Sequence, residues 1–391
     1  MTIAVTLGPT STHIDADVFE LLFDNSTIRL YRDYTKARGS GTITFTKLVE
    51  LARKADIPYP LFFAPLPVVT AQVDLKTKKL LQGVRKSTFS LNTRATVELS
   101  DVELIIKDLV RKQELVKRHD PTLQRNPIVG MLKKSRGGPT ADAQALLAAL
   151  GLTTATLQAA KNKTAAAELF ISRLEASHIL VSRSVNGYMP QTLSKAKFSG
   201  LTVRDAKVPY MFLTGGSHGE EEEPAGRQVF TLALLSVLVA RRVFVPVTMN
   251  ARRIRASPGP EYSIVAEMLM PAAQMRDVTV GSLDEVAAVA EQFKVTPSAL
   301  VVRAVHMKMI DRDQADGYLA VLAEAFRGRP KTKMRSPKPV NAIRKYNGRE
   351  FSVRMLDALD RGRMTHNEFC QLVCSNRIKP ADIAEFRSAM K

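Results

Sequence analysis

Residues that could bind a metal or move a proton are densest in the segment 215–226, which reads GGSHGEEEEPAG. His218 stands just before four consecutive glutamates, Glu220 to Glu223. Imidazole and carboxylate groups at this density could bind a divalent cation. Neighbouring carboxylates in a glycine-rich loop are more often flexible and solvated, and we favour that interpretation. An acidic loop that shields a basic face is a third alternative.

The other residues of these types form no known motif. Cys370 and Cys374 are four residues apart, so a helix would place them on one face, but no further ligand lies nearby. We interpret them as buried thiols in a reducing compartment. The sequence contains no P-loop, dinucleotide fingerprint, zinc-finger spacing or nucleophile elbow. Five isolated histidines are expected at the surface or in packing: His13, His119, His178, His306 and His366. The sequence therefore predicts no metal site and no cofactor.

Positive charge is the strongest compositional signal. The 391 residues carry a net charge of +19, which predicts attraction to a polyanion, most often nucleic acid. Two runs without acidic residues, 75–97 and 325–349, are expected to contact the phosphates of double-stranded DNA. The side chains chosen as contacts are Lys78, Lys79, Arg85, Lys86, Lys331, Lys333 and Arg335. No basic helix with bulky aromatic anchors suggests a membrane surface, and residues 1–15 do not resemble a signal peptide.

Two apolar segments are expected to form the centre of the fold. Residues 229–240 are apolar except for Thr231 and Ser236, and they lack glycine and proline, which predicts a helix buried on all sides. This stretch is too short to cross a bilayer, which needs about 20 apolar residues. A shorter apolar segment, 264–270, ends at Pro271.

These segments resemble the ImmA/IrrE zinc-peptidase-like family. The matching residues are R-Q-x-F-T-L-A at 227–233 and A-E-x-L-M-P at 266–271. In that family F-T-L-A leads into H-E-x-x-H, which supplies two zinc ligands and a general base. Here the three corresponding positions are Leu234, Leu235 and Leu238, and the acid nearest the family's third ligand is Glu261. Leucine cannot bind zinc or move a proton, so the resemblance implies a pseudo-peptidase.

Helical modules are expected on both sides of this core. Residues 44–67 resemble the segment that joins an Xre-like helix-turn-helix to an ImmA/IrrE domain, although only 25–44 remain for a recognition helix. At 282–310, Ser282 with Glu285 forms a capping box, and Thr296 with Pro297 begins a second helix. This spacing is typical of a helix-turn-helix. Its second helix could read bases through Arg303, or the pair could simply pack on the core.

The local pattern predicts several further elements. Residues 101–117 are expected to form an amphipathic helix with Val110 inside and Lys112 outside, and Thr140 is expected to cap the next helix. We expect an α+β, mostly helical fold with a small zincin-like core of sheet and helices, flanked by helix-turn-helix-like modules. The expected parts are a reduced helix-turn-helix-like module at 1–70, a basic helix and linker at 71–138, a peptidase-like domain at 139–280, a helix-turn-helix-like unit at 281–325, a basic linker at 326–347 and a helical module at 348–391.

The resulting hypothesis is a DNA-binding transcriptional regulator or repressor, of the type found in phage and mobile elements. Its peptidase-like domain would be an inactive scaffold or sensor, so the protein would not be an enzyme. It would act in the bacterial cytoplasm, associated with the nucleoid when bound to DNA, and a homodimer is compatible with this role. The alternative is a protein-interaction factor of the antirepressor or inhibitor type, with an acidic protein as partner. An active metallopeptidase is the least favoured interpretation.

Overall fold

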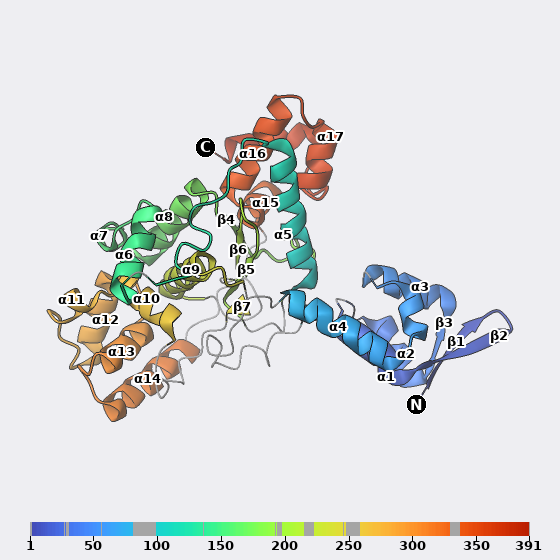
Figure 1. Ribbon diagram of the computed structural model, residues 1–391, viewed down its shortest axis with the longest axis horizontal. Helices are drawn as coiled ribbons and strands as arrows, with labels where there is room; N and C mark the ends of the chain where they lie inside the picture. The colour runs from blue at the N-terminus through green and yellow to red at the C-terminus, as the bar shows by residue number, and fades with distance from the viewer. Residues whose placement is uncertain are drawn as a thin grey trace. The chain divides into compact units, whose positions relative to one another are not determined.

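The protein has an α+β fold that is mostly helical, as the sequence predicted (Figure 1). The computed structural model describes residues 2–26, 28, 31–55, 57–80, 99–135, 137–191, 193, 198–214, 223–244, 246–247, 259–328 and 337–390, with backbone only for 76–80 and 99–101. It divides into unit 1 (1–82, 94–108 and 190–196) and unit 2 (83–93, 109–189 and 197–391). Among the described helices, none has the length and apolar character needed to cross a membrane.

Unit 1 begins with a β-hairpin that was not predicted from the sequence. Strand β1 (Thr2–Leu7) pairs antiparallel with β2 (Thr10–Asp15), and β3 (Thr42–Thr44) lies parallel to β1 on its other side. Gly8 in the turn has φ of +59°, a conformation that glycine adopts without strain. Helix α1 (Ala16–Asp24) follows at once, because the Asp15 side chain accepts a hydrogen bond from the backbone of Asp17.

Three helices and a 3₁₀ turn complete the main part of unit 1. They are α2 (Arg32–Ser40), α3 (Phe45–Lys54), η1 (Tyr59–Phe63) and α4 (Leu66–Leu80). Thr44 caps α3, and Leu48, Leu51 and Ala52 are buried, as predicted. Four aromatic rings form the centre of this core, with neighbouring centroids 4.6–6.1 Å apart: Phe19, Phe23, Tyr34 and Phe62. The short helix α2 therefore stands where a recognition helix was sought, and Tyr34 anchors it to this core.

Unit 2 is built on a four-stranded sheet of order β4-β6-β5-β7. Strands β4 (Leu180–Arg183) and β6 (Tyr210–Leu213) are parallel, whereas β5 (Gly200–Val203) is antiparallel to β6 and to β7 (Pro246–Val247). Helix α9 (Ala225–Ala240) packs against β5, α8 (Lys163–Ala176) and α10 (Pro260–Leu269). Every residue of α9 from Val229 to Ala240 is buried, which confirms the central helix expected from the sequence.

Further helices surround this centre. They are α6 (Pro139–Ala149), α7 (Thr154–Gln158), α11 (Ala272–Met275), α12 (Leu283–Gln292), α13 (Pro297–His306), α14 (Arg312–Arg327) and residues 109–119 of α5 (Leu99–His119), whose first half belongs to unit 1. The Ser282–Glu285 capping box and the Thr296 cap are present as predicted. Helix α6 begins at Pro139 with Gly138 at its N-cap, so the predicted Thr140 cap is wrong. Helix α5 was predicted correctly, but Lys112 is buried and Val110 is 40% exposed, the reverse of our expectation.

The C-terminal part of unit 2 is helical throughout its described length. Its elements are α15 (Pro339–Asn347), α16 (Arg349–Asp360), α17 (His366–Glu368), the π-helical turn η3 (Phe369–Val373), the 3₁₀ turn η4 (Pro380–Asp382) and α18 (Ile383–Ser388). Residues 339–347 had been expected in the basic linker at 326–347, but they form a helix, so that prediction is wrong for these residues. Val340, Ile343 and Tyr346 are buried at helical spacing, so α15 forms because it has a core to pack on.

Candidate functional site

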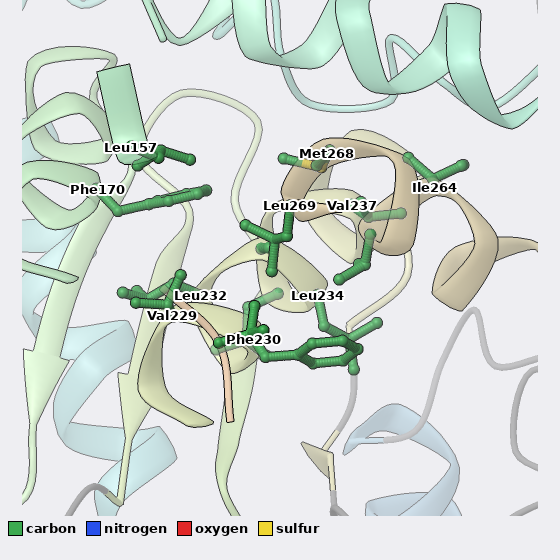
Figure 2. Packing of buried hydrophobic residues seen from close by; sticks show 14 of the residues in the cluster. Leu157, Phe170, Val229, Phe230, Leu232, Leu234, Val237, Ile264, Met268 and Leu269 are labelled. Carbon is green, nitrogen blue, oxygen red and sulfur yellow. The ribbon is translucent and has the colours of Figure 1, made fainter. Parts of the chain in front are cut away.

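The three leucines that the ImmA/IrrE resemblance would align with zinc ligands and a general base lie inside the hydrophobic core. Leu234 and Leu238 are 2% exposed and Leu235 is 0% exposed. Figure 2 shows residues of α9 in one cluster with Phe170 of α8 and Met268 of α10. On the sheet side, a Cβ atom added to Gly200 of β5 would lie 3.0 Å from Cδ1 of Leu235. Side chains therefore fill the space that a metal and its substrate would need.

Two hydroxyl side chains interrupt the apolar stretch of α9. The Ser236 hydroxyl donates to the backbone carbonyl of Leu232 at 2.7 Å, a bond within the helix. The Thr231 hydroxyl is buried and finds no hydrogen-bond partner in the described part of the chain. The described residues also contain no group of three His, Cys, Asp or Glu side chains placed to hold a metal ion.

Glu261, the acid nearest the family's third ligand position, belongs to an ion pair between two helix ends. Its Oε1 atom lies 3.1 Å from Nε of Arg241, the residue that follows α9, and its side chain is 2% exposed. The cation stands at the C-terminus of α9 and the anion in the first turn of α10, where each is favoured by the helix dipole. The arrangement has the character of a structural link between these helices.

Only the last glutamate of the acidic segment lies among the described residues; His218 and 220–222 lie outside them. The Glu223 side chain is 11% exposed, so the expectation of a solvated carboxylate is wrong for this residue. Burial raises the pKa of Glu223, and a hydrogen bond from Ser199 opposes that rise. Its Oε2 atom is buried and finds no partner among the described residues. Glu223 precedes α9, and its Oε1 atom lies 4.0 Å from Nε of Arg227 in the first turn of that helix.

The helix pair α12–α13 packs on the core. The Arg303 side chain is 11% exposed, pairs with Glu267 of α10, and donates from Nε to the Met270 carbonyl at 3.2 Å. At the turn between the helices the backbone approaches α9 so closely that a Cβ on Gly226 would lie 2.7 Å from the carbonyl carbon of Val295. This placement favours the packing alternative over base reading by Arg303.

The remaining candidate DNA contacts are not assembled by the described residues. Lys78 and Lys79 belong to the last turn of α4, where only the backbone is described. Arg85, Lys86, Lys331, Lys333 and Arg335 lie outside the described residues. The charge is nevertheless unevenly distributed along the chain. Residues 1–75 contain eight acidic and seven basic side chains, a net charge of −1, so the rest carries +20.

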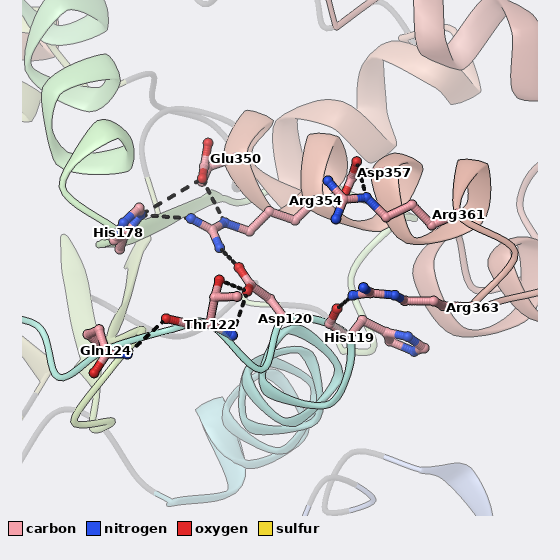
Figure 3. Close-up of polar contacts among 10 residues, drawn as sticks. All are labelled: His119, Asp120, Thr122, Gln124, His178, Glu350, Arg354, Asp357, Arg361 and Arg363. Atoms are coloured by element: carbon pink, nitrogen blue, oxygen red, sulfur yellow. Dashed lines mark hydrogen bonds and ion pairs between the residues drawn. The ribbon is translucent and has the colours of Figure 1, made fainter.

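A polar cluster that was not predicted from the sequence joins the C-terminal helices to the core of unit 2 (Figure 3). The Arg354 guanidinium contacts Asp120 at 2.5 Å, Glu350 at 2.7 Å and Nδ1 of His178 at 2.8 Å. The positive φ of His178, 58°, turns the chain between α8 and β4 at this place. No local pattern marks these residues, because the cluster unites three segments that are far apart in the sequence.

Glu175, at the end of α8, lies beside this cluster at the N-terminus of α16. It is 6% exposed and accepts hydrogen bonds from the backbone N–H groups of Arg349 and Glu350. Gly348 precedes α16 with φ of +81°, and a Cβ there would lie 2.7 Å from Oε1 of Glu175 and 2.3 Å from the Val181 carbonyl oxygen. Burial raises the pKa of Glu175 to about 7. The glycine thus allows a buried carboxyl group to reach the helix end.

Comparisons of this chain with models of protein families, with curated proteins and with solved structures found no match.

Proposed function

We propose that this protein is a non-catalytic, DNA-binding regulator of the phage or mobile-element type, with an inactive ImmA/IrrE-like core as its scaffold. The observation that carries the proposal is the burial of Leu234, Leu235 and Leu238, at 0–2% exposure, on the helix that would bind zinc in an active peptidase. A site for chemistry needs an open position for substrate beside the metal. Closely packed leucines offer neither ligand nor space, which supports a scaffold role.

The zincin-like assignment of this core rests on the resemblance and is supported by the arrangement around α9. A mixed sheet with an antiparallel strand, β5, lies directly on the central helix, and α10 carries the A-E-x-L-M-P motif alongside it. Glu267 of that motif pairs with Arg303, so the motif connects α10 to the helix pair that follows. These contacts give the residues of the motif a structural role that does not depend on peptide hydrolysis.

DNA is the proposed partner because the charge outside residues 1–75 is +20 and includes both acid-free basic runs. Lysine and arginine side chains on phosphates displace condensed counterions, and this supplies affinity that is independent of base sequence. Since Arg303 is engaged with Glu267, we assign it to the scaffold. Any preference for base sequence would then be read by other side chains.

The test is binding of purified protein to duplex DNA at a series of salt concentrations. Neutralising Lys331, Lys333 and Arg335 together should weaken binding to all sequences alike. The slope of the logarithm of the binding constant against the logarithm of the salt concentration should become shallower by up to about 3, one for each lost phosphate contact.

A matched control removes the same charge from the near-neutral segment, where Arg32, Lys36 and Arg53 are exposed. Its salt slope should equal that of the parent protein. Equal losses in both triple variants would show that total charge alone governs binding and would contradict local contacts. If the parent protein fails to bind DNA even at low salt, the interaction-factor alternative replaces this proposal.

A further inference from the structure

Unit 1 carries an apolar recess of about 560 Å³ between the end of α1, the turn η1 and the first half of α4. Most of its lining is aliphatic: Leu22, Ile57, Leu61, Ala64, Val68 and Val73. Asn25 and Gln72 contribute the polar groups, and Asn25 already donates to the Leu21 carbonyl at 2.9 Å. The recess therefore suits an apolar occupant.

Exposed apolar side chains continue the surface beyond the recess. Val68 is 48% exposed and Leu75 is 49% exposed, and their spacing of seven residues places them on one face of α4. Phe63, which is 43% exposed, lies in η1 between two lining residues. A small molecule in the recess would leave Phe63 and Leu75 in water. An apolar surface of this extent is typical of a site for a protein partner.

The charge distribution indicates which partner fits. A second copy of this chain would be repelled by the +20 carried outside residues 1–75, whereas the segment 1–75 itself has a net charge of −1. Two copies can thus approach most easily through unit 1. The surface also offers both a recess and protruding side chains, so a two-fold contact could place Phe63 or Leu75 of each copy in the recess of the other.

We propose that unit 1 is a self-association module, and that two copies of the chain pair through the recess and the Val68–Leu75 face of α4. This inference is independent of DNA binding, because it rests on the apolar surface of unit 1 and on the distribution of charge along the chain. The dimer would present two basic chains to one duplex, which raises the effective affinity of each.

The test is the mass of the full chain, freed of nucleic acid, measured by analytical ultracentrifugation over a range of concentrations. A concentration-dependent dimer is expected. Val68→Asp should raise the dissociation constant of the dimer by about tenfold or more, because dimerisation would then bury a carboxylate in an apolar contact. The control is Val321→Asp on α14 of unit 2, where the valine is 53% exposed. This substitution makes the same change of charge, and the variant should dimerise with the dissociation constant of the parent. Since Val68 is half-exposed, the circular dichroism melting curves of both variants should match that of the parent.

Salt gives a second, independent readout. Added salt screens the repulsion between two +19 chains, so the dimer should strengthen as salt rises. A parent chain that stays monomeric at all concentrations would overturn the proposal, as would a dimer that Val68→Asp leaves intact. Monomeric protein that binds an apolar dye, with binding lost in Val68→Asp, would assign the recess to a small ligand and would equally overturn it.

Discussion

Replacement of Glu175 by glutamine should remove a pH dependence of the free energy of unfolding that the buried carboxyl group of Glu175 causes. Burial raises the pKa of Glu175 from its ordinary value of 4.5 to about 7; the Glu350 carboxylate adds to the rise, while backbone N–H donors and Arg183 oppose it. Between these pH values the folded protein holds a proton that the unfolded chain has released. Stability therefore falls as pH rises from 4.5 to 7 and stays reduced above that. At about 1.4 kcal/mol per pKa unit, the loss amounts to about 3 kcal/mol.

Glu175→Gln keeps the shape and the acceptor oxygen for α16 but cannot ionise. At pH 5 its free energy of unfolding should lie within about 1 kcal/mol of the parent value, because the parent carboxyl group is then mostly protonated. At pH 8 the variant should be more stable than the parent by up to about 3 kcal/mol. The measurement is denaturant unfolding of the full chain, followed by circular dichroism, from pH 5 to pH 8. The difference between variant and parent isolates this group, since other titrating groups contribute equally to both.

Glu385→Gln provides the control, because Glu385 is exposed on α18 of the same unit. Because the side chain is exposed, this substitution should change the free energy of unfolding only slightly. The reasoning about Glu175 would be refuted if Glu175→Gln were less stable than the parent by a constant amount from pH 5 to pH 8. That result would mean that an ionised carboxylate stabilises the N-terminus of α16.

Two further predictions concern α9. Leu235→His should lower the free energy of unfolding by about 3–5 kcal/mol, because it loses packing and buries an unpaired imidazole. The control, Val321→His at an exposed site, should change the free energy of unfolding by less than about 0.5 kcal/mol. Equal melting temperatures of both variants would place α9 at the surface. Protein dialysed against buffer should contain no stoichiometric zinc by elemental analysis, since Leu234 and Leu238 cannot act as ligands, and one zinc per chain would contradict the inactive core.

Features set by neighbouring residues were predictable from the sequence. The run 229–240 contains almost only aliphatic residues, so a buried helix was the one structure that could shield it. The caps at Ser282 and Thr296 were equally clear, because a hydroxyl side chain satisfies a backbone donor of its own helix. The hairpin at 2–15 was not predicted, although it too has a local signal, the alternation of Ile3 and Val5 before Gly8.

Features set by distant partners were not predictable. Lys112 was expected in water, yet it lies over the Tyr346 ring, with Nζ 3.8 Å from the ring centroid. Arg303 was a candidate for base contact, with packing on the core as the alternative, and in the structure its guanidinium pairs with Glu267. A charged side chain is buried only when a partner offsets the loss of hydration, and a sequence pattern does not show which residue that is. The same reason hid the Glu175 site, where the carboxyl meets the start of a helix far along the chain.

The position of Arg303 changes where DNA recognition is to be sought. The turn at 295–296 lies against Gly226 and Arg303 pairs with Glu267, so the α12–α13 pair is held to α9 and α10, and we assign it to the proposed scaffold. Under our proposals, the basic runs supply phosphate contacts. Pairing through unit 1 brings in a second chain with the same basic runs. These two interactions respond oppositely to salt: phosphate binding weakens, while pairing of two +19 chains strengthens. At low salt the chain should therefore bind DNA first and pair on it, because phosphates then neutralise the charge that opposes pairing.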